Sequence, residues 1–299
     1  MDMLHIKGLS KGFGYKKVLC GLDLLVPEHS IFGFIGKNGA GKTTTMKTVL
    51  GLLRADSGEI LVNGESVVYG QTDTNRYIGY LPDVPEFYPF MTATEYLRFS
   101  GEITGMGRAE CEERTGELLS LVGLAGENHR IKGYSRGMKQ RLGIAQALLN
   151  RPKLLICDEP TSALDPVGRR EILDILMAVR EQTTVLFSTH ILSDVERICT
   201  DVAFLNNGTV EIQGRLADIK KIYRGREYQL ETDGEADVML LETAFTDMRR
   251  IDRRRLVFSE SRYPLPEILG FMGAHGISPV RLERVEPTLE ELFMEVTEK

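Results

Sequence analysis

A glycine-rich segment carries the strongest chemical signal, because its glycines, lysine and threonine have the spacing of a phosphate-binding loop. The residues expected to contact a nucleotide here are Gly36, Lys37, Asn38, Gly39, Ala40, Gly41, Lys42, Thr43 and Thr44. The glycines let the backbone turn so that several N–H groups converge on a polyanion. We expect Lys42 to neutralise the β- and γ-phosphates and the Thr43 hydroxyl to bind Mg²⁺.

Two acids at the end of an apolar run extend this chemistry towards hydrolysis. Residues 154–157 are apolar, and Asp158 and Glu159 follow them. One carboxylate at such a position can hold Mg²⁺, usually through water, and a second can polarise an attacking water. A protein that only binds nucleotide needs one acid, so the pair favours hydrolysis. The alternative is that these two residues are capping or surface acids without a catalytic role.

Two further segments are ambiguous when each is taken alone. His190 follows a second predicted buried strand, residues 184–188. A lone histidine is more often structural than catalytic, but ligands bind at the carboxyl ends of parallel strands, which favours a role in the site. Residues 134–141 join a polar turn to a helix and by themselves indicate only a capped helix with a basic first turn.

The elements around these residues follow an alternating order. Residues 2–30 predict short strands with turns near 12–14 and 27–28, and residues 31–35 predict a strand buried on both faces. A helix follows the glycine loop, with apolar residues at 46, 49, 50 and 53 on one face. Residues 85–150 are mostly helical in pattern, with Thr92 and Glu95 as a capping box. Asp165 and Pro166 predict the start of another helix. Strands alternating with helices indicate a largely parallel sheet.

The pattern changes after about residue 220. Residues 218–226 have the polar and basic character of a linker. Residues 227–299 predict strand, helix, strand, helix, strand, helix, and Thr288 with Glu291 caps the last helix. We therefore expect an α/β domain over residues 1–217, with a helical subdomain at about 86–150, and a small α/β domain over 227–299.

Composition limits the function further. The chain has 299 residues, a net charge of −6 and four cysteines, with no CxxC pair. An acidic chain gives no sign of nucleic-acid binding, and the cysteines indicate neither disulfides nor a metal site. The longest stretch without a charged residue, 268–280, is broken by glycines and proline and is shorter than a membrane span. No signal peptide is evident, so any membrane role is expected to come through a partner.

Taken together, these motifs resemble the nucleotide-binding subunit of the ABC transporters. Their order is the phosphate loop, the signature segment 134–141, the acid-ended strand, residues 162–165 and His190, and the match covers residues 2–217. The resemblance implies a P-loop NTPase fold with a mainly parallel sheet and an N-terminal antiparallel β region. It also implies a homodimer with two molecules of ATP, each with Mg²⁺, between the subunits.

The resemblance gives individual residues a role. Asp158 would hold Mg²⁺, Glu159 would orient or activate water, and His190 would contact the γ-phosphate. Ser135 and Gly137 of the opposite chain would close on the γ-phosphate, and Asp165 would couple the two sites. Phe13 stands where the family places an aromatic that stacks on adenine. Tyr15 is a rival for that role, and Phe13 as a core or turn aromatic is the plain alternative.

This sequence departs from the usual family pattern at three positions. Asp83 replaces a glutamine that links Mg²⁺ to the transmembrane partner, and as an acid it can still bind Mg²⁺ through water. In the signature segment, Arg136 replaces a glycine and Met138 replaces a glutamine. Ser135 and Gly137 remain as the expected phosphate donors.

These variants, with the tail residues 287–293, resemble ABC-2 type drug and polymer exporters that carry a small C-terminal domain. The expected function is an ATPase motor that couples dimer closure to a separate permease at the cytoplasmic face of the membrane. A soluble ABC ATPase acting on ribosomes or nucleic acid is the alternative. Against it, the segment between Thr43 and Ser135 holds no heptads for a long coiled coil, and the chain has one cassette. A nucleotide-binding regulator would not need Glu159.

Overall fold

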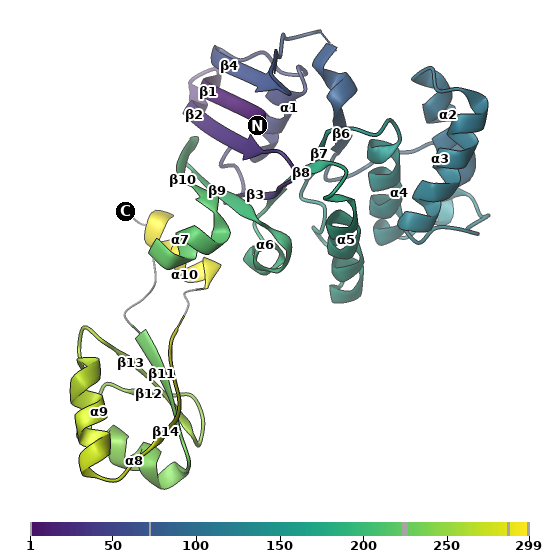
Figure 1. Cartoon of the computed structure of the whole chain (residues 1–299). Helices are drawn as coiled ribbons and strands as arrows, with labels where there is room; N and C mark the ends of the chain where they lie inside the picture. The colour runs from purple at the N-terminus through teal and green to yellow at the C-terminus, as the bar shows by residue number, and fades with distance from the viewer. Residues whose placement is uncertain (1, 72, 223–226, 286–287, 298–299) are drawn as a thin grey trace. The chain divides into compact units, whose positions relative to one another are not determined.

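A computed structural model describes residues 2–71, 73–222, 227–285 and 288–297. The chain forms two compact units, Met1–Leu216 and Ala217–Lys299. Each unit has its own sheet or sheets and its own apolar core (Figure 1). None of the helices in these described ranges has the length and hydropathy that a membrane-spanning helix needs.

An antiparallel sheet begins the larger unit. Its strands are β1 (Asp2–Phe13), β2 (Lys16–Pro27), β4 (Ser57–Val62) and β5 (Glu65–Ser66), in the order β2-β1-β4-β5. The sequence predicted several short strands with a turn at 12–14, but β1 and β2 are long and meet at a turn after Phe13. Register shifts along the β1–β2 pair, one of them beside Gly8 with its positive φ of 58°, absorb the irregular alternation that suggested shorter strands.

A six-stranded sheet forms the centre of the larger unit, in the order β10-β9-β3-β8-β7-β6. Its strands are β3 (Ile31–Gly36), β6 (Ile78–Leu81), β7 (Leu154–Asp158), β8 (Thr184–Thr189), β9 (Asp201–Asn206) and β10 (Thr209–Arg215). Every pairing is parallel except that of β10 with β9. The carboxyl ends of β3, β6, β7 and β8 therefore share one edge, where ligands bind in such sheets.

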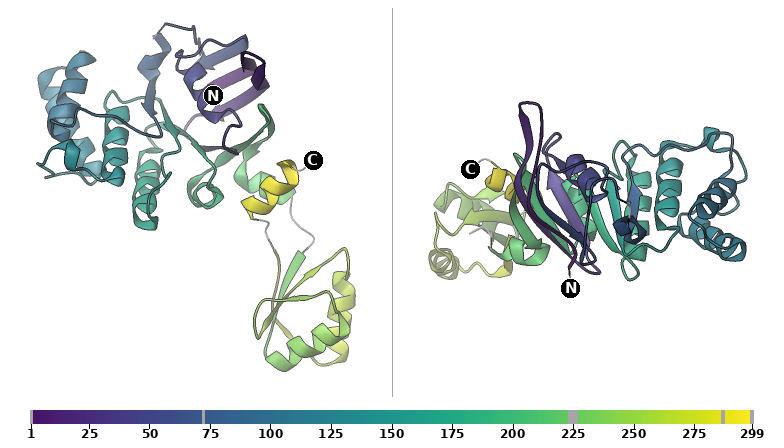
Figure 2. Two further views of the ribbon diagram at one scale, coloured as in Figure 1. Left: turned by 180° about the vertical axis from the view of Figure 1, so that it is seen from behind. Right: turned by 90° about the horizontal axis from the view of Figure 1, so that it is seen from above.

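Helices complete the larger unit. They are α1 (Lys42–Val49), α2 (Ala93–Ile103), α3 (Arg108–Leu121), α4 (Arg136–Leu148), α5 (Pro166–Val179) and α6 (Leu192–Ile198), with 3₁₀ turns at Asp73–Tyr77 and Ile131–Gly133. The predicted capping box of Thr92 and Glu95 is confirmed, with N–H···O distances of 3.3 and 2.8 Å. Both views in Figure 2 show α2 and α3 gathered beside α4, away from the antiparallel sheet.

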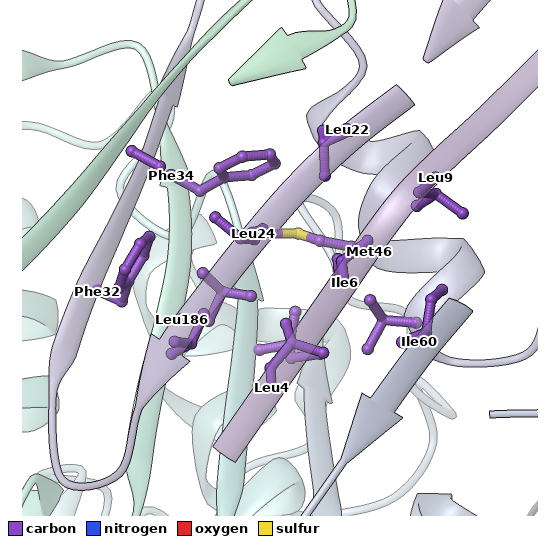
Figure 3. Close-up of a cluster of buried hydrophobic side chains, with 14 of the residues drawn as sticks. Leu4, Ile6, Leu9, Leu22, Leu24, Phe32, Phe34, Met46, Ile60 and Leu186 are labelled. Atoms are coloured by element: carbon purple, nitrogen blue, oxygen red, sulfur yellow. The ribbon is translucent and has the colours of Figure 1, made fainter. Parts of the chain in front are cut away.

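The two sheets share one core with the helix that follows the glycine loop. Met46 of α1 lies fully buried among Leu4, Ile6 and Leu24 of the antiparallel sheet and Phe34 of β3 (Figure 3). Successive residues of β3 point to opposite faces of the sheet, so its alternate residue Gly33 faces α6, where a Cβ would stand 3.0 Å from Val195. The start of α1 is thereby fixed between two packed layers.

The smaller unit has the order α7 (Leu216–Ile222), β11 (Glu227–Thr232), α8 (Glu235–Ala244), β12 (Arg249–Arg250), β13 (Arg255–Ser259), α9 (Leu265–Ala274), β14 (Pro279–Arg284) and α10 (Leu289–Thr297). The strands form an antiparallel sheet, β12-β13-β11-β14. A core that includes Leu230, Phe258, Leu241 and Ile268 joins this sheet to α8 and α9.

The linker predicted at 218–226 is helical up to residue 222, because Leu216 and Ile219 are buried with helical spacing; residues 223–226, like residue 287 of the tail match, lie outside the described residues. The cap of α10 is confirmed, with Thr288 and Glu291 exchanging hydrogen bonds of 2.9 and 3.2 Å.

Candidate functional site

The glycine loop lies between β3 and α1, and three of its glycines are required by its shape. Gly39 and Gly41 have φ values of +82° and +115°, in the region that favours glycine. A Cβ at Gly41 would lie 2.7 Å from Leu19, and one at Gly36 would lie 2.8 Å from the Leu205 carbonyl oxygen. No side chain caps α1. Its first N–H groups and the positive end of its dipole are therefore available to an anion.

Lys42 is held inside this loop and is only 6% exposed. Its Nζ donates to the carbonyl oxygen of Gly36 at 2.6 Å and to that of Lys37 at 3.4 Å. The same Nζ lies 3.2 Å from Oε1 of Glu159. Lys42 is thus an almost buried cation whose nearest anion is a carboxylate.

Asp158, at the end of β7, is buried and accepts two short hydrogen bonds. Thr43 Oγ1 donates to its Oδ2 at 2.7 Å, and Ser188 Oγ donates to its Oδ1 at 2.6 Å. A hydroxyl and a carboxylate oxygen this close are hard ligands of the kind that Mg²⁺ prefers. No group of three or more potential metal-binding His, Cys, Asp or Glu side chains occurs in the described ranges. The Thr43 hydroxyl and the Asp158 carboxylate fit a Mg²⁺ that takes few protein ligands and the rest from phosphate and water.

Glu159 connects the loop to His190. Its Oε2 lies 2.9 Å from His190 Nδ1, and its backbone N–H donates to Ser188 Oγ at 3.1 Å. Its φ is +50°, a left-handed conformation that is strained for a residue with a side chain. The structure thus brings Glu159, His190 and Lys42 together, as the sequence motifs predicted for one site.

A cavity of about 410 Å³ lies over these groups. It is lined by Val18, Asn38, Gly39, Gly41, Lys42, Thr43, Thr44, Asp83, Asp158, Glu159, Ser162 and His190. Sequence reasoning missed Val18 and the supporting Ser188, and it placed Ser162 in a motif without giving it a role. Ser188 pairs in register with Asp158 across β8 and β7, so strand alignment was the signal that could have found it.

Asp83 follows β6 and lies at one side of this cavity. The pKa of Asp83 is raised above its usual value. Burial is the largest cause, the Arg136 guanidinium opposes it, and the carboxylates of Asp158 and Glu159 add to it. Burial and the charge of Asp158 raise the pKa of neighbouring Tyr80 to about 12. The cavity thus concentrates negative charge opposite Lys42, a setting that favours a bound cation.

Several predicted residues lie outside the cavity. Phe13 is half exposed, with Lys11 Nζ 5.4 Å from its ring centroid, and Tyr15 is fully exposed. The carbonyl oxygens of Gly36 and Lys37 accept hydrogen bonds from Lys42 Nζ, and the Ala40 N–H donates to the Lys37 carbonyl oxygen. These contacts give Gly36, Lys37 and Ala40 a part in shaping the loop.

The remaining predicted residues start helices. Ser135 caps α4, accepting from the Met138 N–H at 3.2 Å, and Gly137 lies in its first turn. Asp165 caps α5, accepting from the Gly168 N–H at 2.9 Å. None of the three is among the residues that line the cavity described above.

Comparisons with known proteins agree with this geometry. A family model described as ABC transporter matches residues 19–162, and the C-terminal domain of DrrA1-3-like ATP-binding proteins matches residues 214–297. YxlF of Bacillus subtilis strain 168, described as an uncharacterised ABC transporter ATP-binding protein, is 38% identical, with 98% of this chain and 99% of the relative covered. The bacitracin transport ATP-binding protein BcrA of Bacillus licheniformis is 35% identical, with 96% and 95% covered.

A solved ATP-binding subunit of an ABC transporter is also similar, at 34% identity and a TM-score of 0.66, with 74% of this chain and 93% of that chain covered. The predicted P-loop fold and ATPase activity are confirmed, and the alternative of an ATPase that acts on ribosomes finds no support. This chain belongs to the ATP-binding subunits of the ABC transporters, which hydrolyse ATP to power transport.

Proposed function

We propose that two copies of this chain close on two molecules of Mg·ATP and drive a separate membrane permease, as the motor of an exporter. In this proposal residues 1–217 are the ATPase domain, with the helical subdomain at about 86–150, and residues 227–299 are an accessory domain. The start of α4 carries the argument for a dimer.

Within the part of the chain that the structure describes, the Ser135 hydroxyl and the first two N–H groups of α4 donate to no partner. Ser135 Oγ accepts a hydrogen bond from the Met138 N–H, which leaves its own proton free to donate. The nearest atom to a Cβ at Gly137 is 3.9 Å away, so packing within the subunit does not explain the glycine. No acid occupies the first turn of α4. In the proposed dimer, the γ-phosphate of the ATP bound to a second copy accepts hydrogen bonds from these donors, and the helix dipole favours its negative charge.

The chemistry follows from the contacts of Glu159. Lys42 now pairs with this carboxylate, and a triphosphate on the glycine loop offers Lys42 a more highly charged partner. Glu159 is then free to accept a proton from water, while His190 remains beside it to hold its orientation and to contact the γ-phosphate. Mg²⁺, held by Thr43, Asp158 and, through water, Asp83, would neutralise charge that develops on the phosphates.

The relatives favour an exporter at the cytoplasmic face of the membrane. Among them are a bacitracin transport protein and the linearmycin resistance protein LnrL of Bacillus subtilis strain 168, which is 31% identical with 99% of this chain and 98% of the relative covered. Cargo selection belongs to the permease in this proposal, and nucleic acid has no part in it. Sequencing the reading frame beside this gene and, where it encodes a membrane protein, co-expressing and co-purifying the two proteins tests the partner.

Replacing Glu159 with glutamine tests the dimer. Because the amide cannot accept the proton from water, Glu159→Gln is expected to bind ATP, fail to hydrolyse it and accumulate as a dimer. Size-exclusion chromatography with and without Mg·ATP measures this.

A matched control removes an acid outside the cavity. Glu110 pairs with Arg151 on the helical region, with both side chains about half exposed, and Glu110→Gln should hydrolyse ATP at the parent rate. A Glu159→Gln protein that stays monomeric with ATP and turns it over like the parent contradicts the proposal.

A further inference from the structure

One face of α4 contacts the segment that follows β6. The contacts come from Arg136, Gln140 and Gly143, which are spaced i, i+4 and i+7 and so share a face of the helix. A Cβ at Gly143 would lie 2.5 Å from Leu81 and 3.2 Å from Pro85. The helix and this segment are therefore packed closely, with glycine where the side chains of Leu81 and Pro85 meet the helix.

Two of these contacts converge on Asp83. Gln140, fully buried, donates its Nε2 to the Asp83 carbonyl oxygen at 2.7 Å. One turn nearer the start of α4, Arg136 Nη2 lies 3.3 Å from Asp83 Oδ1, with the two side chains 43% and 47% exposed. The backbone of Asp83 is thus fixed by a buried bond, and its carboxylate faces the guanidinium.

The two residues of this pair lie at two different sites of the subunit. Asp83 lines the cavity that holds Lys42 and Glu159. Arg136 is the neighbour of Ser135, which caps α4. Both residues depart from the usual family pattern, where a neutral glutamine and a glycine stand. The structure shows that these departures have opposite charge and meet each other.

We propose that Asp83 and Arg136 form a positioning pair that orients Ser135 and Gly137 from the nucleotide cavity of the same subunit. The pair links two sites of one subunit. The first is the cavity that binds the subunit's own ATP, and the second is the start of α4, which contacts the ATP bound to the partner subunit. This inference rests on the proposed dimer. It assigns neither residue a direct contact with the partner's triphosphate.

A double-mutant cycle tests the pair. In the Glu159→Gln background, Asp83→Asn, Arg136→Gln and the double variant are compared by sedimentation equilibrium for dimerisation with Mg·ATP. Because the pair is partly exposed, each single change is expected to weaken the dimer by about two- to fivefold, and the double variant no further. Arg136→Lys should restore most of the affinity, and higher salt should weaken the parent dimer more than the variants.

The matched control is Arg151→Gln, which breaks an ion pair of similar exposure elsewhere in the helical region and should leave dimerisation unchanged. If Arg136→Gln weakens the dimer equally whether or not the Asp83→Asn change is also present, then Arg136 acts directly on the triphosphate and the inference is wrong. Single variants that dimerise like the parent also overturn it. A parent that never dimerises overturns the proposed function instead, so the two failures are distinguishable.

Discussion

The two units of this chain place their charged side chains differently. In the larger unit, Lys42, Asp158 and Asp194 are each less than 10% exposed, and the first two of them line the cavity. In the smaller unit, every ion pair among the described residues has both partners at least 30% exposed, as in Arg250–Glu235. Thr232 is the one buried polar side chain that the structure describes there.

This difference separates charges that serve a site from charges that keep a surface solvated. Burying a charge costs free energy unless partners surround it, so a buried cluster without a ligand indicates a function. The cluster of arginines at 249–255 has two possible roles, a solvated face or a contact with lipid headgroups or a partner. Arg250 forms ion pairs with Glu235 and Glu242, and Arg255 forms one with Asp252, all within the smaller unit. These pairs favour the solvated face for the two arginines.

Lys42→Ala should give the largest effect. It removes the cation of the glycine loop and leaves Glu159 without its counter-charge, so ATP binding and turnover should both be lost. Titration with a fluorescent ATP analogue and a phosphate-release assay measure the two. Lys47→Ala is the control, because Lys47 is an exposed lysine of the helix that Lys42 begins and does not line the cavity. Normal turnover in Lys42→Ala would remove the phosphate-loop assignment.

Arg169→Gln should destabilise the larger unit. Asp194 is buried, accepts from Thr161 Oγ1 at 2.7 Å and pairs with Arg169 Nη2 at 2.7 Å. Removing Arg169 leaves a buried carboxylate with one neutral partner, at a cost of about 3 kcal/mol in the free energy of unfolding. Urea unfolding followed by circular dichroism measures it.

The control for this change is Arg197→Gln, which breaks the exposed Arg197–Asp174 pair of the same unit. It should leave the urea midpoint close to that of the parent, because exposed ion pairs contribute little. Equal losses from both variants would mean that burial does not separate the two kinds of charge.

Local patterns in the sequence predicted most elements but not the contacts between them. The strand, glycine loop and helix around Lys42 follow from composition and period alone, as does the cap at Thr92. The bond from Ser188 to Asp158 depends on the register of β7 against β8. The meeting of Arg136 with Asp83 depends on how closely α4 packs on β6, which the spacing of residues in the sequence does not determine.

Asp83→Gln should have a moderate effect. Asp83 is about half exposed, unlike Asp158, and the glutamine usual in the family keeps an oxygen ligand at this place. Basal hydrolysis should stay within about tenfold of the parent, or ~1.4 kcal/mol. Asp158→Asn is the comparison and should lose far more, because Thr43 and Ser188 both donate to that carboxylate. A collapse of the rate in Asp83→Gln would show that the negative charge itself is needed.

Arg255→Gln, in the smaller unit, should have the smallest effect. The hydrogen bond from Arg255 is the largest cause that lowers the pKa of Asp252, followed by the Arg254 N–H. A carboxyl group with a lowered pKa stabilises the fold above its ordinary pKa, and this contribution is lost as pH falls through the lowered value. In Arg255→Gln the acid-side loss should begin at a slightly higher pH, while the melting temperature at pH 7 and the ATPase rate stay near the parent values. Thermal unfolding between pH 3 and 7 measures the shift. A large loss of stability or turnover at pH 7 would show that this exposed pair matters as much as the buried charges of the larger unit. The contrast between the two units would then be wrong.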